Sequence, residues 1–202
     1  MNKQKEILII ANGNSIINYE YGNYINKFST VARINNFQTS KFEKHIGEKT
    51  DLWFHGANQG VKEKKIHPKK IIILVPSKVL NGNQTKIKKR IKSRQNLNTN
   101  EYTLVDVKNI LRYESLLSLK RLTTGIKSIL WSMENYNRVI IHGFDFFTIS
   151  KNHYFDSRIR KWFYNNFYTL AKKHDVKKEM DYVNTLIKNK KILLLNELLI
   201  KY

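Results

Sequence analysis

The sequence predicts a single α/β domain built on a Rossmann-like, doubly wound and mostly parallel sheet of about seven strands. Short apolar runs alternate with longer segments of helical periodicity, which is the pattern of strands joined through helices. Most of these runs are continuous rather than alternating, so we expect both faces of the sheet to be covered. The length of 202 residues suits one domain with a full core.

Seven runs are predicted to be strands: Glu6–Ala11, Thr30–Asn35, Asp51–Phe54, Lys70–Pro76, Tyr102–Val105, Arg138–His142 and Lys191–Leu195. Between them, apolar residues at helical spacing predict four helices, within Val107–Leu111, Ile126–Met133, Ile159–Leu170 and Met180–Ile187. The second and third strands are so close in sequence that little more than one helical turn fits between them.

Two regions depart from this alternation. Gly82–Asn100 is polar and rich in lysine and asparagine, and we expect an exposed loop. Residues 147–173 are aromatic and follow a strand end, so they are interpreted as a lid over a site. No repeat or linker divides the chain, so residues 1–202 are predicted to form one domain. The apolar run Ile192–Ile200 is open to three interpretations: an interface, a membrane contact, or a buried strand with its following turn.

Composition limits the function classes. The chain has no cysteine, which excludes a disulfide scaffold and a cysteine-ligated zinc site. It has no apolar stretch of membrane-spanning length, and we expect a cytoplasmic protein, with peripheral contact at the inner membrane as a further expectation. The formal charge of +21 suits nucleic acid, an anionic membrane or compositional drift. Because the lysines are scattered, no nucleic-acid partner is expected.

Polar residues follow the first two predicted strands, where parallel sheets bind ligands. The clusters are Asn12-Gly13-Asn14-Ser15 and Asn35-Asn36. Gly13 allows a ligand close to the backbone, and Ser15 can cap a helix whose amides attract an anion. The two carboxamides can read a pyrimidine edge or a sugar hydroxyl. Ordinary turns explain both clusters equally well when each is taken alone.

Further candidates lie in the second half of the chain. Thr123-Thr124-Gly125, preceded by Arg121, begins a predicted helix and suits a carboxylate or phosphate; a capping threonine is the simpler interpretation. Gly143-Phe144-Asp145 can place an acceptor on ribose hydroxyls, or form a tight turn. His153 and Tyr154 can donate to a phosphate, or simply pack. His174 can take a proton from a sugar hydroxyl, although a lone surface histidine is more often inert.

Metal chemistry is not expected. The sequence contains no Asp-x-Asp pair, no His-Glu-x-x-His motif and no calcium loop. A departing phosphate would then be stabilised by histidine, tyrosine, arginine and helix dipoles.

Taken in order, these motifs resemble the bacterial sialyltransferases of glycosyltransferase family 42, and they are similar to motifs of the animal sialyltransferases of family 29. The segments that carry the resemblance are 9–15, 31–35, 123–125, 143–146, 153–156 and His174 with Glu179. They span residues 7 to about 195, whereas residues 56–100 match poorly.

The resemblance implies an inverting, metal-independent transfer of sialic acid from CMP-sialic acid to a sugar hydroxyl on a bacterial surface glycan, such as lipooligosaccharide or capsule. It also implies a homo-oligomer, and the charge suits a lipid-linked acceptor. The implied contacts are Asn12 and Gly13 for the nucleotide, Asn35 for the cytidine and phosphate, Thr124 and Gly125 for the sialic acid carboxylate, Arg121 at its border, Gly143 and Asp145 for the ribose and base, and His174 as general base.

Some positions depart from the family pattern. One of two phosphate-supporting tyrosines falls at Phe147, and the other at His153 or Tyr154. A donor-binding asparagine falls at Gly56, where Asn58 is the candidate substitute. Three alternatives therefore stay open: a transferase for another CMP-activated keto sugar acid such as Kdo, a basic nucleic-acid-binding protein, and an inactive sugar-nucleotide-binding domain.

Overall fold

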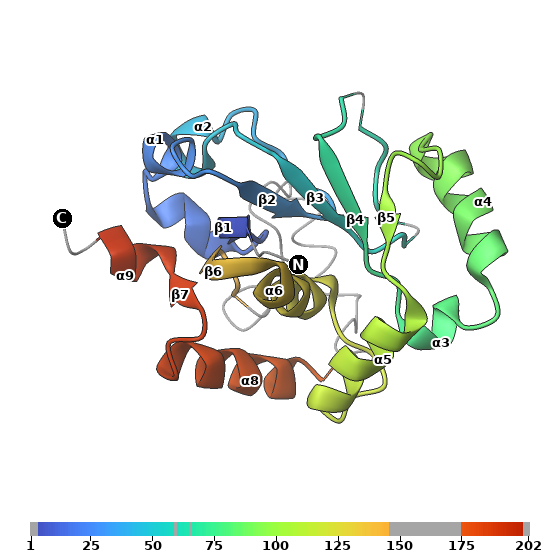
Figure 1. Ribbon diagram of the computed structural model, residues 1–202. Coiled ribbons are helices and arrows are strands. Elements are labelled where there is room, and N and C mark those ends of the chain that lie inside the picture. The colour runs from blue at the N-terminus through green and yellow to red at the C-terminus, as the bar shows by residue number, and fades with distance from the viewer. Residues whose placement is uncertain (1–3, 59, 65, 146–174, 200–202) are drawn as a thin grey trace, which may run out of the picture.

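The computed structural model describes residues 4–58, 60–64, 66–145 and 175–199. Within them, seven strands form one sheet in which every neighbouring pair is parallel (Figure 1). In spatial order they are β5 (Thr103–Leu104), β4 (Lys70–Ile73), β3 (Leu52–His55), β2 (Val31–Ile34), β1 (Gln4–Ile10), β6 (Tyr136–His142) and β7 (Leu193–Leu194). Each predicted run overlaps one strand, and the bounds of β1, β3 and β6 differ from the predicted ones by one or two residues; the predicted fold class is confirmed.

Helices cover both faces of the sheet. α5 (Val107–Leu116), α6 (Thr124–Asn135) and α8 (Val176–Lys188) pack on one face (Figure 1). α1 (Gly22–Ile25), α4 (Gln84–Gln95) and α9 (Leu195–Leu199) pack on the other. The shorter elements are η1 (Asn14–Asn18), α2 (Glu43–Ile46) and α3 (Ser77–Leu80). The single turn of α2 is what the short spacing between the second and third strands predicted.

β1 shows why the strands read as continuous apolar runs. Ile7 and Ile9 face α6, whereas Leu8 and Ile10 face α1 and α9, and all four are at most 2% exposed. Burial of one such side chain contributes about 1.5–3 kcal/mol. A sheet covered on both sides therefore selects branched apolar residues at consecutive positions along the buried part of β1, whereas the exposed start Gln4-Lys5 is polar.

The order of the strands creates a switch point beside β1. From β1 the chain moves outward through β2, β3 and β4 to β5, and then returns to place β6 on the other side of β1. Ligands of open α/β sheets bind outside the carboxyl ends of the strands at such a point. The register pairs Ile10 with both Arg33 and His142, so the loops after β1, β2 and β6 start level with one another.

The predicted loop at 82–100 is wrong, because α4 occupies Gln84–Gln95. Ile87, Ile91 and Gln95 recur every four residues and are at most 2% exposed. The two isoleucines pack against Trp53 and Ile73 of the sheet. This buried stripe is too narrow to stand out among six basic residues.

The C-terminal run forms the half-buried strand β7 followed by α9, so a strand is confirmed there, while the interface and the membrane contact stay predictions. Leu195 is fully buried against Leu8, Ile10 and Ile140, and β7 pairs with β6. No helix among the described residues is long and apolar enough to cross a membrane.

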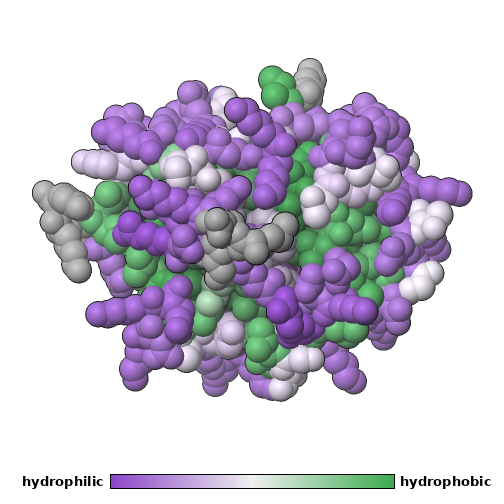
Figure 2. Space-filling model, in the orientation of Figure 1, coloured by the Kyte–Doolittle hydropathy of each residue, from purple (hydrophilic) through white to green (hydrophobic). Residues whose placement is uncertain are grey.

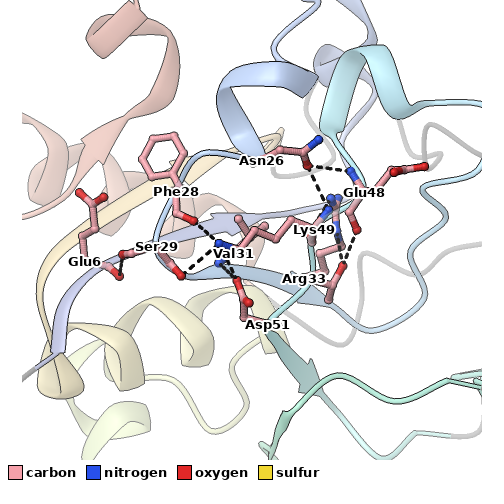
Figure 3. Close-up of polar contacts among 10 residues, drawn as sticks. Glu6, Asn26, Phe28, Ser29, Val31, Arg33, Glu48, Lys49 and Asp51 are labelled. Atoms are coloured by element: carbon pink, nitrogen blue, oxygen red, sulfur yellow. Dashed lines mark hydrogen bonds and ion pairs between the residues drawn. The ribbon is translucent and has the colours of Figure 1, made fainter.

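Arg33 is a charged residue in the interior of the sheet. Its side chain is fully buried, and its guanidinium donates to the carbonyls of Ile46, Gly47 and Lys49, at 2.7, 2.9 and 3.2 Å. Asn26, which follows α1, accepts with its Oδ1 from the amides of Glu48 and Lys49 on the same connection (Figure 3). A buried cation needs such partners to offset its lost hydration. Arg33 therefore fixes the connection from β2 to β3.

Candidate functional site

The loops after β1 and β6 are bound to each other at the switch point. The amide of Gly13 donates to the carbonyl of Gly143 at 2.9 Å. The carboxylate of Asp145 accepts from the amide and the hydroxyl of Ser15, at 2.9 and 2.5 Å. These contacts join positions 130 residues apart and make one continuous floor out of two predicted motifs.

Two glycines of this floor have no room for a side chain. A Cβ at Gly13 would lie 2.3 Å from Cγ of Asp145. Gly143 has a φ of 72°, and a Cβ there would lie 2.4 Å from Cγ2 of the buried Ile16. Glycine is therefore needed at position 13 for close approach, and at position 143 for both close approach and backbone conformation.

Ser15 does not cap a helix, contrary to the expectation from sequence. Gly13 stands at the N-cap of η1, and both Asn14 and Ser15 lie inside this five-residue 3-10 helix. The Ser15 amide that was expected to attract a ligand anion is instead bound by Asp145. An anion from the same chain thus occupies this helix start.

Asn12 links the ends of β1 and β2. Its Nδ2 donates to the carbonyls of Ile34 and Asn36, at 2.9 and 2.7 Å. Its Oδ1 is buried, and no described residue donates to it. A buried acceptor without a partner costs free energy, so a ligand donor at this position would be favourable. The carboxamide of Asn36, in contrast, bonds the backbone of Gly60 and Lys62 and holds the loop after β3.

The loop after β3 meets the start of α6. Asn35 adopts a φ of 47°, and its Oδ1 accepts from the amide of Gly56 at 2.9 Å. A Cβ at Gly56 would lie 2.7 Å from Oγ1 of Thr124, 3.2 Å from Oδ1 of Asn35 and 3.5 Å from Nδ2 of Asn58. Three predicted contact residues from three separate segments therefore surround the small space above Gly56.

The start of α6 is held by a buried acid. Thr123 caps the helix by accepting from the amide of Ile126, at 3.3 Å. Its own amide and hydroxyl donate to Glu179 of α8, at 2.7 and 2.6 Å. Glu179 is fully buried, and burial raises its pKa, opposed by the bonds from Thr123. Thr124 and Gly125 follow in the first turn, whose amides lack partners within the helix and suit an anion.

Phe144 connects the loop after β6 with the start of α6. A Cβ at Gly125 would lie 3.3 Å from Cε1 of Phe144, so the ring of the β6 loop lies against the start of α6. Gly13 contacts Asp145, and Gly125 contacts Phe144. The structure thus brings the motifs at 12–15, 35–36, 56–58, 123–125 and 143–145 together at one edge of the sheet.

Lys127 lies one turn into α6 and is only 1% exposed. Its Nζ donates to the carbonyl of Leu74 at 2.6 Å. Burial lowers the pKa of Lys127 to about 7, with Glu114 and Glu179 raising it and Arg121 lowering it further. The predicted contact residue Arg121 is exposed. Its guanidinium is near enough to influence this buried amine beneath the site.

The remaining candidates lie outside the described residues. These are His153, Tyr154 and His174, together with Phe147 and the predicted lid at 147–173. Asp175, which directly follows His174, caps α8 by accepting from the amide of Lys178 at 3.1 Å. Because Glu179 in the first turn of α8 contacts Thr123, α8 begins close to the start of α6.

Sequence reasoning missed the structural importance of Glu179 and of the pair Asp145–Ser15. The only local signal for Glu179 was its distance of five residues from His174 in a motif. His55, at the end of β3, was not considered. It is fully buried, its Nδ1 accepts from the amide of Ala57 at 2.7 Å, and burial lowers its pKa to about 4. The neutral ring therefore shapes the turn that presents Asn58.

The fold and the site define an α/β protein whose ligand site lies at the switch point beside β1, with a helix start ready for an anion. Residues 2–191 match glycosyltransferase family 29 (sialyltransferase), and the chain belongs to this family. It is therefore an enzyme of the glycosyltransferase class. The sequence resemblance placed family 42 first and family 29 second; membership of family 42 and a bacterial source stay predictions.

Solved structures share the fold. A mammalian sialyltransferase superimposes with a TM-score of 0.72 and 17% identity, covering 95% of this chain and 69% of that one. A mammalian sialyltransferase in complex with Gal-beta-1-3GalNAc-ortho-nitrophenol superimposes with a TM-score of 0.70 and 18% identity, covering 95% of this chain and 69% of that one. The sialyltransferase CstII from Campylobacter jejuni, in complex with the substrate analogue CMP-3FNeuAc, superimposes with a TM-score of 0.58 and 16% identity. The superposition covers 95% of this chain and 81% of that one. At these identities the likeness concerns the fold.

One sequence relative is named for the transfer of a different sugar. Fifty residues are 38% identical to the beta-1,6-galactosyltransferase GALT29A of Arabidopsis thaliana. This match spans 25% of the chain and only 13% of the length of that protein.

Proposed function

We propose that this chain transfers a sialic acid, or a closely similar keto sugar acid, from a CMP-activated donor to a hydroxyl of an acceptor glycan. The observation on which the proposal depends is the convergence of five separate motifs at the carboxyl edge of the sheet. The family to which the chain belongs supports it, as do CMP-containing ligands in related structures.

The described residues suit such a donor. The unpartnered Oδ1 of Asn12 lies at the end of β1 and can accept from the nucleotide. The first turn of α6 offers amides and the hydroxyl of Thr124 to the sugar carboxylate. Asn58 reaches toward the space above Gly56 and is our candidate for the missing asparagine. Gly143 and Asp145 then border the ribose, as the resemblance implies.

The proposed reaction is a single displacement. Nε2 or Nδ1 of His174 takes the proton of the acceptor hydroxyl while its oxygen forms a bond to the anomeric carbon. The bond from that carbon to the phosphate oxygen breaks, and CMP leaves with the electron pair, supported by His153 and Tyr154. A positioned base contributes about 10²–10⁴-fold to the rate. No metal enters this scheme, because fixed hydrogen-bond donors stabilise the leaving phosphate.

The test is transfer from CMP-sialic acid to a panel of galactosides, with and without a chelator. We expect turnover that is insensitive to the chelator, and a loss of at least ~100-fold in kcat for His174→Ala with donor affinity retained. His45 lies in α2 and bonds the carbonyl of Tyr19, so His45→Ala is the matched control and should leave kcat unchanged.

Three further donors and ligands separate the alternatives. Turnover with CMP-Kdo alone would assign the other keto sugar acid, and turnover with UDP-galactose alone would favour the activity named for the plant relative. CMP binding without any turnover would indicate an inactive domain. Binding of an oligonucleotide without CMP binding would refute the proposal, and that binding should weaken steeply with salt. The cytoplasmic location and the homo-oligomer stay predictions.

A further inference from the structure

α4 places a line of positive charge beside the proposed site. The helix carries six basic residues and no acidic one. Three of them, Lys86, Arg90 and Arg94, recur every four residues and so lie on one flank, over about 12 Å of helix. We call these three residues the basic stripe. No acidic side chain of the described residues lies within ion-pair distance of them.

One hollow of the surface lies at each end of the basic stripe. Arg90 and Arg94 line a cavity too narrow for a water molecule, together with Ala57 and Asn58 of the β3 loop. Lys86 lines a second, open hollow with Asn83 at the start of α4. The basic stripe therefore runs away from Asn58 along the surface, and Figure 2 shows that hydrophilic residues dominate the visible face.

The cavity end of the basic stripe has an unused donor. Nη1 of Arg94 is buried and has no hydrogen-bond partner among the described residues. A guanidinium presents its N–H groups as a fork that matches the two oxygens of a carboxylate or phosphate. This nitrogen has no acidic or carbonyl partner among the described residues, so the charge of Arg94 adds to the positive charge of the basic stripe at its end nearest Asn58.

The turn after β3 connects this donor to the transferase site. His55, buried under α4, holds the amide of Ala57, and Ala57 adopts a φ of 49° before Asn58. Nδ2 of Asn58 lies 3.5 Å from the Cβ position of Gly56, which is itself 2.7 Å from Oγ1 of Thr124. One side chain, Asn58, therefore separates the start of α6 from the cavity of Arg90 and Arg94.

We propose that the basic stripe binds a phosphate or carboxylate carried by the acceptor glycan, so that the natural acceptor is an acidic glycan. This inference rests on the proposed transferase function. The anion would lie along α4, on the side of Asn58 away from the start of α6. Its attraction to the basic stripe would lower KM for the acceptor without changing the chemical step.

The experiment compares two acceptors that differ only in charge: a β-galactoside disaccharide, and the same disaccharide with a phosphate on its reducing-end sugar. For the parent enzyme at low salt, we expect KM to be at least ~10-fold lower for the phosphorylated acceptor, with similar kcat. Arg90→Gln/Arg94→Gln should abolish this difference and leave KM for the neutral acceptor unchanged. Lys88→Gln/Lys92→Gln removes two charges from the opposite flank of α4 and should retain the difference.

Several outcomes would overturn the inference. Equal KM values for the two acceptors in the parent enzyme would do so, as would equal effects of the two double variants. A preference seen only when the acceptor is presented on phosphatidylglycerol vesicles would assign the basic stripe to the membrane instead. If no donor is turned over, the proposed function fails, and titration of the phosphorylated disaccharide still tests the basic stripe. Arg90→Gln/Arg94→Gln must weaken that binding, with matching melting temperatures showing that both variants fold.

Discussion

Replacing Gly13 with alanine tests the contact between the β1 and β6 loops. The new methyl carbon would lie 2.3 Å from Cγ of Asp145 and 2.5 Å from each carboxylate oxygen. Ordinary carbon contacts are about 3.5–4.0 Å, so the carboxylate must withdraw by at least ~1.2 Å. That withdrawal breaks its bonds to the amide and hydroxyl of Ser15. Gly13 has φ −66° and ψ 151°, which alanine adopts freely, so the cost comes from the clash.

The magnitude follows from the two lost hydrogen bonds. Bonds to a charged acceptor contribute about 1.5–3 kcal/mol each, and we expect Gly13→Ala to lower the free energy of unfolding by about 3 kcal/mol. In the Asp145→Ala background the methyl has space, so the same change should cost less than ~1 kcal/mol. Urea denaturation of the parent, the two single variants and the double variant measures the coupling.

The control for this cycle is Gly60→Ala. A Cβ at Gly60 meets only Oδ1 of Asn58, at an ordinary distance of 3.6 Å, so its effect should stay within about 0.5 kcal/mol. Additive costs of Gly13→Ala and Asp145→Ala, within about 0.5 kcal/mol, would refute the assigned contact.

Three further predictions concern buried groups. Glu179→Ala should lower the free energy of unfolding in urea by about 3 kcal/mol, because the amide and the hydroxyl of Thr123 both lose their acceptor. Glu179→Gln should become more stable relative to the parent as pH rises above 4.5, because the raised pKa makes ionisation of Glu179 costly in the folded state. A stability difference that does not change with pH would contradict this. The pKa of Lys127 is about 7 in the folded protein, so between about pH 7 and 9 the amine is protonated in the unfolded chain but largely neutral in the folded one. The stability of the parent relative to Lys127→Met should therefore rise over this range by up to about 1.4 kcal/mol per pH unit, and a stability difference that does not change with pH would refute this. Gly143→Ala should cost about 2 kcal/mol or more, from its φ of 72° and the contact with Ile16, and a midpoint shift worth under ~0.5 kcal/mol would contradict the geometry.

The sequence allowed the sheet to be predicted because burial on both faces leaves a direct signature. The four consecutive apolar residues Ile7–Ile10 that end β1 have no simpler explanation than two covered faces. α6 was equally accessible, because its stripe from Ile126 to Met133 is fully apolar. α4 was missed because Ile87 and Ile91 are the only apolar residues of its buried stripe, and the third member, Gln95, is polar.

The site could be predicted as a set of motifs but not as a set of contacts. The order of the strand ends placed Asn12, Thr124 and Gly143 at one edge. The bond between Ser15 and Asp145 spans 130 residues, and no local pattern distinguishes a ligand-binding aspartate from one that closes a loop. The predicted cap by Ser15 was wrong because Gly13 is the N-cap of η1, and Ser15 lies inside that helix with its amide and hydroxyl donating to Asp145.

Glu179 gives the molecule a mechanical property. Its carboxylate is shared between α8, which follows position 174, and the first turn of α6, 56 residues earlier in the chain. Any motion that separated these helices would expose the carboxyl group of Glu179 or leave it buried without its hydrogen-bond donors. α6 and α8 are therefore expected to move as one rigid unit, so that the spacing between the proposed anion site at the start of α6 and the start of α8 is set when the chain folds.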